Sequence, residues 1–279
     1  MMHHTVRGSD GNASDARSWR MSTLFIVGGG LFGSLAAVYA RRKGIEAVVF
    51  DCGREGSASY AAAGLFTERW TGRKLHAHYL YALPLLEQLY PIQSILLSHD
   101  GPTESFLFVP PSAILEAAPI REQVTSVGDG WLEAAGQRYE GWVYIAAGIW
   151  SGQFLPGLEV HGKAGAAFLF AGEREGRIRQ TAAGRQCLAF VRDRGTTYFG
   201  DGTAERMYTE EHDRQSLSRA AEMGLSEPIA RLWGQRPYSP RGPVFQRIAA
   251  RTWLATGGRK MGTILGASFA RRLVEEELP

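Results

Sequence analysis

Cysteine is scarce in this chain, which has two cysteines in 279 residues. Cys52 and Cys187 stand far apart, and neither lies in a spacing typical of a metal site. The sequence therefore argues against a disulfide framework and suits a reducing compartment, so we expect a cytoplasmic location. The histidines are scattered, and His76 and His78 stand two residues apart, which suits joint ligation poorly. We interpret both as surface residues and predict no metal site.

An excess of charge and long apolar runs are also missing. The formal net charge is +3, with basic and acidic residues interspersed and no basic stripe interleaved with aromatic residues. A nucleic-acid partner is therefore not expected. No apolar run approaches the length of a membrane span, so none is predicted. The polar residues 1–21 lack the apolar core of a signal peptide, and we expect a disordered leader there.

A glycine-rich turn follows the first apolar segment. Residues 24–27 have the composition of a short buried strand, and a helical pattern covers residues 31–42. Between these segments, Gly28, Gly30 and Gly33 follow the G-x-G-x-x-G spacing. The first glycine permits a tight turn, the second lets the backbone approach a pyrophosphate, and the third lets the helix pack closely on the strand.

An acidic residue ends the next predicted strand, Glu46 to Phe50. Asp51 lies about 20 residues beyond the glycines, where a carboxylate accepts a hydrogen bond from a ribose hydroxyl and disfavours NADP. The helix N-terminus would point its amides and positive dipole end at the phosphates. A tight turn without a ligand explains glycines alone, but the order of these elements predicts an adenine dinucleotide. The pattern leaves open whether that dinucleotide is FAD or NAD.

The rest of the chain alternates between helical and extended patterns. Ser57 to Phe66, SASYAAAGLF, predicts either close packing against a flat group or an alanine-rich core helix. The loop GGRKMG near the C-terminus repeats the logic of the opening turn. We expect strands at 94–97, 105–109, 123–127, 131–134, 142–146 and 252–256, a β-rich region at 164–199, and helices at 73–90 (kinked or broken at Pro84), 111–117, 209–224, 226–233 and 262–277.

Four stretches together resemble the D-amino-acid oxidase / glycine oxidase family of FAD-dependent oxidoreductases. They are IVGGGLFGSLAA with VVFD, SASYAAAGLF, YIAAGIWSG, and RPYSPRGPVF with WLATGGRKMGTILGASFARRL. The resemblance implies an α/β fold whose discontinuous, Rossmann-like FAD-binding domain comprises 22–72, 107–157 and 240–279. A smaller β-rich α+β substrate domain would comprise 73–106 and 158–239. The chain is shorter than is usual for the family, which suggests a trimmed substrate domain and a more open flavin.

The resemblance also implies which residues would hold FAD. The three glycines of the turn would meet the pyrophosphate, Asp51 the adenosine ribose, and Val124 the adenine. Because the GGRKMG loop has no cysteine or histidine, the FAD is expected to be non-covalent. The expected cofactor-binding residues are Gly28, Gly30, Leu31, Phe32, Gly33, Asp51, Cys52, Ser59, Ala63, Gly64, Val124, Gly148, Gly258, Arg259, Met261, Gly262 and Thr263.

The activity implied by the resemblance is oxidation of a C–N bond in an amine or amino acid. A hydride would pass to flavin N5, and the resulting imine would hydrolyse. Lys260 and Arg236 are the catalytic candidates, as anchors for the substrate or as electrostatic helpers; a structural salt bridge or turn contact is the other interpretation of Arg236. A peptide, protein or biosynthetic intermediate is the alternative substrate. A third hypothesis is a flavin-carrying subunit of an oligomer that is inactive without its partner.

Overall fold

A five-stranded sheet lies at the centre of one half of the molecule. The computed structural model describes residues 22–98, 103–115, 118–181, 184 and 186–279, so the predicted leader falls outside the described residues. The strand order is β15-β16-β9-β1-β2, in which all neighbours are parallel except β15 and β16. The strands are β1 (Leu24–Val27), β2 (Ala47–Phe50), β9 (Trp142–Ile145), β15 (Val244–Ala249) and β16 (Thr252–Thr256).

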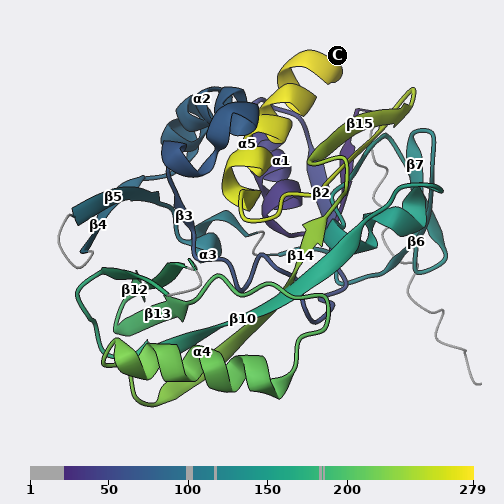
Figure 1. The fold of residues 1–279 in the computed structure, drawn as a ribbon. Helices are drawn as coiled ribbons and strands as arrows, with labels where there is room; N and C mark the ends of the chain where they lie inside the picture. The colour runs from purple at the N-terminus through teal and green to yellow at the C-terminus, as the bar shows by residue number, and fades with distance from the viewer. Residues whose placement is uncertain (1–21, 99–102, 116–117, 182–183, 185) are drawn as a thin grey trace, which may run out of the picture.

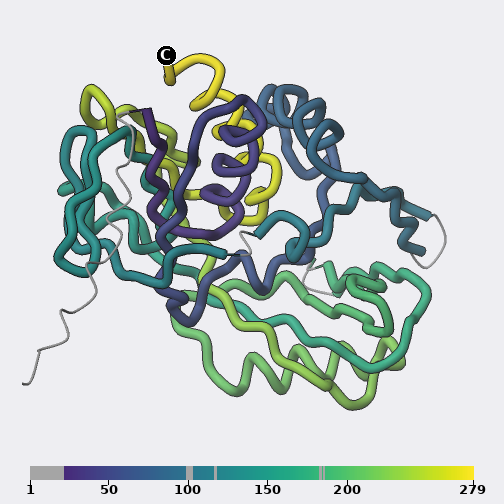
Figure 2. Tube along the Cα trace, turned by 180° about the vertical axis from the view of Figure 1, so that it is seen from behind, coloured from purple at the N-terminus to yellow at the C-terminus, as the bar shows by residue number. Residues whose placement is uncertain are grey.

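The two faces of this sheet are covered by different elements. Because side chains alternate along a strand, Leu24 and Ile26 point to one face of β1, and Phe25 and Val27 to the other. The first face packs on helices, which lie side by side in Figures 1 and 2. They are α1 (Leu31–Arg42), α5 (Gly262–Arg272) and, against α5, α2 (Gly72–Leu89). The second face is covered by the small sheet of β6 (Val124–Gly128), β7 (Trp131–Ala134) and β8 (Gln137–Glu140).

An eight-stranded sheet forms the other half of the molecule, below the helices in Figure 1. Helix α4 (Glu210–Glu222) covers its outer face, and the capping box of Thr209 with His212 fixes where that helix begins. The order is β14-β10-β13-β12-β11-β4-β5-β3. Its strands are β3 (Leu65–Phe66), β4 (Gln93–Ser98), β5 (Thr103–Phe108), β10 (His161–Ala171), β11 (Arg177–Gln180), β12 (Gln186–Asp193), β13 (Thr196–Gly200) and β14 (Pro228–Tyr238).

The predicted fold class is confirmed. A mostly parallel sheet with helices on one face carries the glycine turn, and a separate eight-stranded sheet with one helix lies against it. The domain ranges remain a prediction. Helix α2, which we expected to belong to the substrate domain, packs its buried side against α5 of the other half.

The segment 226–233 is not a helix, so that prediction is wrong. It forms the first part of β14, whose register with β10 runs from Tyr238 opposite His161 to Pro228 opposite Phe170. Proline at the start of an edge strand leaves the ladder of hydrogen bonds intact. The long pairing with β10 therefore outweighs a short and weak local helical pattern.

Smaller differences concern the helices. Helix α3 (Pro111–Ile114) is shorter than predicted, because Leu115 is already extended with ψ 136°; residues 116–117 lie outside the described residues. Helix α2 runs through Pro84 without a break. The segment after β9 forms a 3₁₀ helix (Gly148–Phe154). The C-terminal helix ends at Glu277 as predicted, although its last turn, past α5, is π-helical. A second short 3₁₀ helix spans Glu68–Trp70.

His78 is not a surface residue, contrary to the prediction. It is half-buried between α2 and α5, where its Nδ1 lies 2.8 Å from Ser268 Oγ and its ring meets Phe269 edge-on. Burial lowers the pKa of His78, and nearby Arg272 adds to the effect. The helical period explains the placement, since His78 shares a face with Ala82.

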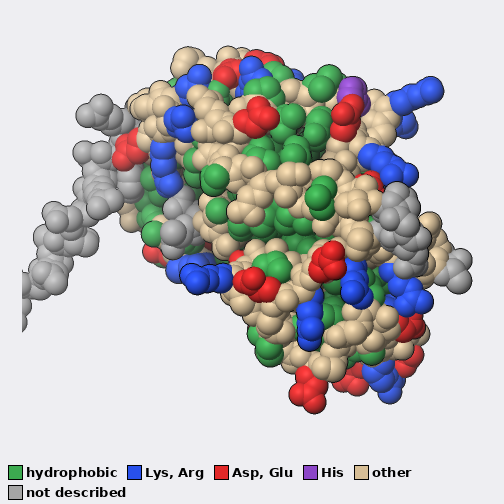
Figure 3. All heavy atoms as spheres, turned by 90° about the vertical axis from the view of Figure 1, so that its left-hand side faces the viewer, with side chains coloured by type: hydrophobic (Ala, Val, Ile, Leu, Met, Phe, Trp, Pro, Cys, Tyr) green, Lys and Arg blue, Asp and Glu red, His purple; other side chains and the backbone are tan. Residues whose placement is uncertain are grey.

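Hydrophobic side chains gather on the face formed by α2, β4 and β5. Figure 3 shows them across the middle of this face, with charged side chains above and below. Leu80 on α2 and Leu96 on β4 are among the most exposed large hydrophobic residues of the molecule. Within the described part of the chain, no helix combines the length and apolar character needed to cross a membrane.

Candidate functional site

A cavity of about 510 Å³ opens where the parallel strands end and the eight-stranded sheet begins. Four residues at or just beyond the carboxyl ends of β1, β2, β9 and β16 line it: Gly28, Asp51, Gly148 and Thr256. In open α/β sheets, ligands bind at this edge because the loops after the strands converge there. The fold therefore places the predicted nucleotide turn at one wall of a cavity.

Close packing explains the three glycines of the turn. A Cβ on Gly28, whose φ is +103°, would lie 2.6 Å from the carbonyl oxygen of Ala146. A Cβ on Gly30 would lie 2.8 Å from Ser59 Oγ, and one on Gly33 only 1.9 Å from the Gly28 oxygen. Gly28 and Gly30 line the cavity, whereas Gly33 lets α1 pack on the turn from behind.

Asp51 lines the cavity and also fixes the turn. Its Oδ2 accepts a hydrogen bond of 2.7 Å from the amide of Gly29, and its Oδ1 one of 2.7 Å from the amide of Gly53. Each carboxylate oxygen has a second lone pair, so Asp51 can still accept a hydrogen bond from a ligand hydroxyl. The carboxylate thus has a structural role that the sequence pattern did not reveal.

The small-residue loop 57–64 passes between α1 and β14. Ser59 Oγ accepts a hydrogen bond of 2.9 Å from the amide of Leu31 at the start of α1. On the other side, a Cβ on Gly234 of β14 would lie 2.7 Å from the Cα of Ala58. The alanines 61–63 line the cavity, so the small side chains allow close packing on one side and leave space on the other.

The second glycine loop lies beside the start of α1: a Cβ on Gly258 would lie 2.9 Å from Phe32 Cζ. Gly257 has φ +78° and Arg259 has φ +48°, a left-handed conformation that is unfavourable for a side chain larger than glycine. The amide of Arg259 donates to Pro237 O at 3.3 Å, and its Nη2 donates to Ser239 O at 3.2 Å. The end of β14 thus holds the loop at the start of α5, whose first turn has no acidic residue.

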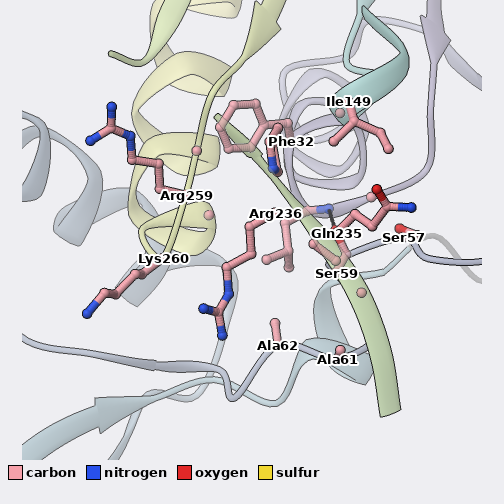
Figure 4. A pocket seen from close by; sticks show the side chains of 18 of the residues that line it. Phe32, Ser57, Ser59, Ala61, Ala62, Ile149, Gln235, Arg236, Arg259 and Lys260 are labelled. Atoms are coloured by element: carbon pink, nitrogen blue, oxygen red, sulfur yellow. Dashed lines mark hydrogen bonds between the residues drawn. The ribbon is translucent and has the colours of Figure 1, made fainter. Parts of the chain in front are cut away.

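The N-termini of two helices therefore flank one cavity. Helix α1 also has no acidic residue in its first turn. The unpaired amides and the positive dipole end at each helix start favour an anionic ligand. Lys260 and Arg236, the two catalytic candidates, also line the cavity. In Figure 4 both side chains extend to the same side, whereas Arg259 turns away from them.

The cavity brings the predicted residues together with two exceptions. Gly33 and Met261 are not among the residues that line it; Met261 is buried in the helical core before α5. The lining includes Gly28, Gly30, Leu31, Phe32, Asp51, Cys52, Ser59, Ala63, Gly64, Val124, Gly148, Arg236, Gly258, Arg259, Lys260, Gly262 and Thr263.

Several residues that line the cavity were not predicted from the sequence. Arg54 stacks over Trp150, with its Cζ 5.4 Å from the ring centroid, near the Asp51 end of the cavity. Glu122 also lines the cavity, and its buried Oε2 has no hydrogen-bond partner. Their positions just after β2 and just before β6 were the available signal, because loops at the ends of strands carry ligands.

Tyr198 is another lining residue that the sequence analysis missed. It lies on β13, and its hydroxyl donates to the carbonyl of Ala61 at 3.2 Å, which ties the small-residue loop to the large sheet. Burial raises the pKa of Tyr198, and the positive charges of Arg236 and Arg192 oppose that rise. The hydroxyl is therefore protonated at neutral pH and can donate this bond. No cluster of metal-ligating side chains occurs among the described residues.

Comparison with solved structures establishes the fold. No family model and no curated protein matches the sequence. Iminodiacetate oxidase from a Chelativorans species is 18% identical with a TM-score of 0.69, over 90% of this chain and 94% of that chain. Glycine oxidase from Bacillus cereus is 15% identical with a TM-score of 0.69, over 92% and 98% of the two chains. L-proline dehydrogenase from P. horikoshii is 13% identical with a TM-score of 0.70, over 92% and 95%. This chain therefore has the fold of these amine-oxidising and amino-acid-oxidising enzymes.

Proposed function

We propose that the protein binds FAD without a covalent bond and oxidises a C–N bond of an amine or amino acid. The observation that carries this proposal is the cavity itself, flanked by two glycine loops and two helix N-termini, with Arg236 and Lys260 on its wall. The likeness to oxidases and dehydrogenases of amino acids and amines supports it.

The residues on the cavity wall fit FAD along its length. Asp51 can accept a hydrogen bond from the adenosine ribose, and the orphaned Oε2 of Glu122 can accept one from the exocyclic amine of adenine. The α1 N-terminus suits the pyrophosphate. A nicotinamide dinucleotide would leave the second glycine loop before α5 without a role, which favours FAD over NAD.

Bound FAD would supply the redox chemistry by taking a hydride from the carbon next to the amine nitrogen. This chain would bind and orient the substrate. Arg236, whose Nη1 donates to Gly202 O at 3.4 Å, is held on the cavity wall and suits a substrate carboxylate as a rigid fork of donors. The positive end of α5 would stabilise negative charge that develops on the flavin.

A visible absorption spectrum followed by anaerobic addition of amines and amino acids tests the proposal. We expect flavin bands in the purified or reconstituted protein, and we expect one class of compound to bleach them. Protein that takes up no flavin would refute the cofactor assignment. Flavin that is bound but never bleached would favour the alternative of a flavin-carrying subunit, whose partner would cover the apolar face seen in Figure 3.

A further inference from the structure

Two residues with positive charge occupy opposed positions on neighbouring strands next to the cavity. Lys163 on β10 and Arg236 on β14 are direct partners in the antiparallel register, so their side chains leave the same face of the sheet. Like charges in this position destabilise a sheet unless an anion lies between or beside them. The pair therefore indicates an anionic ligand at this point of the sheet.

The cationic surface extends along the same face away from Arg236. Tyr238, two residues after Arg236, has Lys163 Nζ 4.5 Å and Arg259 Cζ 4.6 Å from its ring centroid. Alternation along β14 puts Tyr238 on the face of Arg236. We call Lys163, Arg236, Tyr238 and Arg259 the cationic strip.

The charges of the strip are not neutralised within the described part of the chain. Neither Lys163, Arg236 nor Arg259 forms an ion pair there, and Lys260 beside them forms none either. Several arginines elsewhere in the described chain have acidic partners. Examples are Arg179 with Glu222 at 2.7 Å, Arg231 with Asp213 at 2.9 Å and Arg271 with Glu275 at 2.9 Å.

Glu205 is the acidic residue that strand pairing brings nearest to Lys163, but it does not lie on the face of the sheet that carries the strip. Glu205 is bridged to Ala164, which neighbours Lys163 on β10 and therefore points to the other side of the sheet. One substrate carboxylate on Arg236 would leave Lys163 and Arg259 without a counter-charge. The strip therefore has room for a second anionic group, next to the first.

We propose that the substrate is an amino acid with a second carboxylate, which binds on Lys163 while Arg236 holds the first. This inference rests on the proposed function. A small molecule fits because the strip begins on the cavity wall and its second cation stands directly opposite Arg236. Directly opposed side chains have Cβ atoms about 5 Å apart, a separation that a short dicarboxylate can span. The aromatic ring of Tyr238 holds the cations without neutralising them.

Binding of two matched ethers tests the inference without turnover. Diglycolate has two carboxylates and methoxyacetate has one, and neither has an amine to oxidise. By calorimetry on the flavin-loaded protein at low salt, we expect diglycolate to bind at least about tenfold more tightly than methoxyacetate. Lys163→Met should remove most of this difference, whereas Lys163→Arg should keep it. The exposed Lys74→Met on α2 is the matched control and should change neither affinity.

The outcomes separate this inference from the proposed function. Equal affinity for the two ethers, or an equal loss of both in Lys163→Met, would overturn the second-carboxylate site. If the protein takes up no FAD but binds diglycolate through Lys163, the proposed function fails and the anion site stands. If FAD binds but neither ether does, the cofactor assignment stands and this inference fails.

Discussion

The glycine turn after β1 and the paired strands β10 and β14 line the same cavity by different means. The turn contributes backbone: Gly28 and Gly30 leave room for a ligand, and Asp51 and Ser59 fix amides around it. The strands contribute side chains, above all Arg236; Lys163, opposite it on β10, lies just outside the lining. Substitutions in the first region should therefore affect cofactor binding, and substitutions in the second should affect the substrate.

The largest loss of stability should follow from an unpaired charge in the large sheet. Asp201 is fully buried, and its Oδ2 pairs with Arg219 on α4. Arg219→Ala would leave that carboxylate buried without its partner, which typically costs about 3–5 kcal/mol. Urea denaturation measures the loss. Arg214→Ala is the control, since its exposed pair with Glu211 at 2.8 Å should contribute about 0–1 kcal/mol. Similar losses in both variants would refute the assigned role of Asp201.

The second-largest loss of stability should follow from a substitution that displaces the backbone of the glycine turn. Gly33→Ala places a Cβ 1.9 Å from the Gly28 oxygen, so α1 must move away from the turn. We expect a loss of about 1–3 kcal/mol together with weaker FAD binding, because the same shift displaces Gly28 and Gly30. Ser218→Ala on the exposed side of α4 should change neither quantity. Normal FAD affinity in Gly33→Ala would refute the inference that the packing of α1 on the turn supports FAD binding.

Loss of a charged side chain from β14 should weaken substrate binding without weakening FAD binding. Arg236→Met removes a charged hydrogen-bond donor from the cavity wall, so we expect the substrate to bind about 10- to 100-fold more weakly. FAD affinity should stay within about twofold of the unaltered protein. Both are measured by titration of the flavin spectrum. If FAD affinity fell together with substrate affinity, Arg236 would have a structural role, which is the other interpretation of this residue.

The smallest effect on stability should come from His78, which lies between α2 and α5 and does not line the cavity. The folded protein holds the pKa of His78 below 6.5, so the unfolded chain takes up this proton first as the pH falls. The stability contribution is thus present above about pH 6.5 and is lost as the pH falls through the lower folded value. Urea midpoints between about pH 8 and pH 5 should therefore fall less in His78→Asn than in the unaltered protein. His76→Asn, whose side chain is 42% exposed, should behave like the unaltered protein.

The two regions also differed in how well the sequence predicted them. The turn is local in sequence: strand, glycines, helix and acid follow one another, and each has a strong preference for its conformation. Its elements were placed almost to the residue. Strand β14 depends on pairing with β10, about 70 residues earlier in the chain at the Lys163–Arg236 pair, and local patterns carry no trace of that partner. The predicted helix at 226–233 failed for this reason.

The site showed the same limit. Most of the residues that were predicted from the two glycine-rich loops line the cavity. Tyr198 and Lys163 were missed because only the register of the large sheet brings them beside Ala61 and Arg236. Gly33 was predicted both to let the helix pack closely and to meet the pyrophosphate. A Cβ there would meet the backbone of Gly28 rather than the cavity, which agrees with the first of these roles. Spacing identifies a turn, but only the three-dimensional packing shows which glycine faces the cavity.

The most direct test of this account is a titration of the flavin-free protein with FAD, followed by flavin fluorescence. We predict saturation at one FAD per chain. In Gly30→Leu, where a side chain would meet Ser59 Oγ and occupy the turn, no saturation is expected. Equal binding by both proteins would contradict the placement of FAD on this turn, and no binding by either would contradict the assignment of FAD to the cavity.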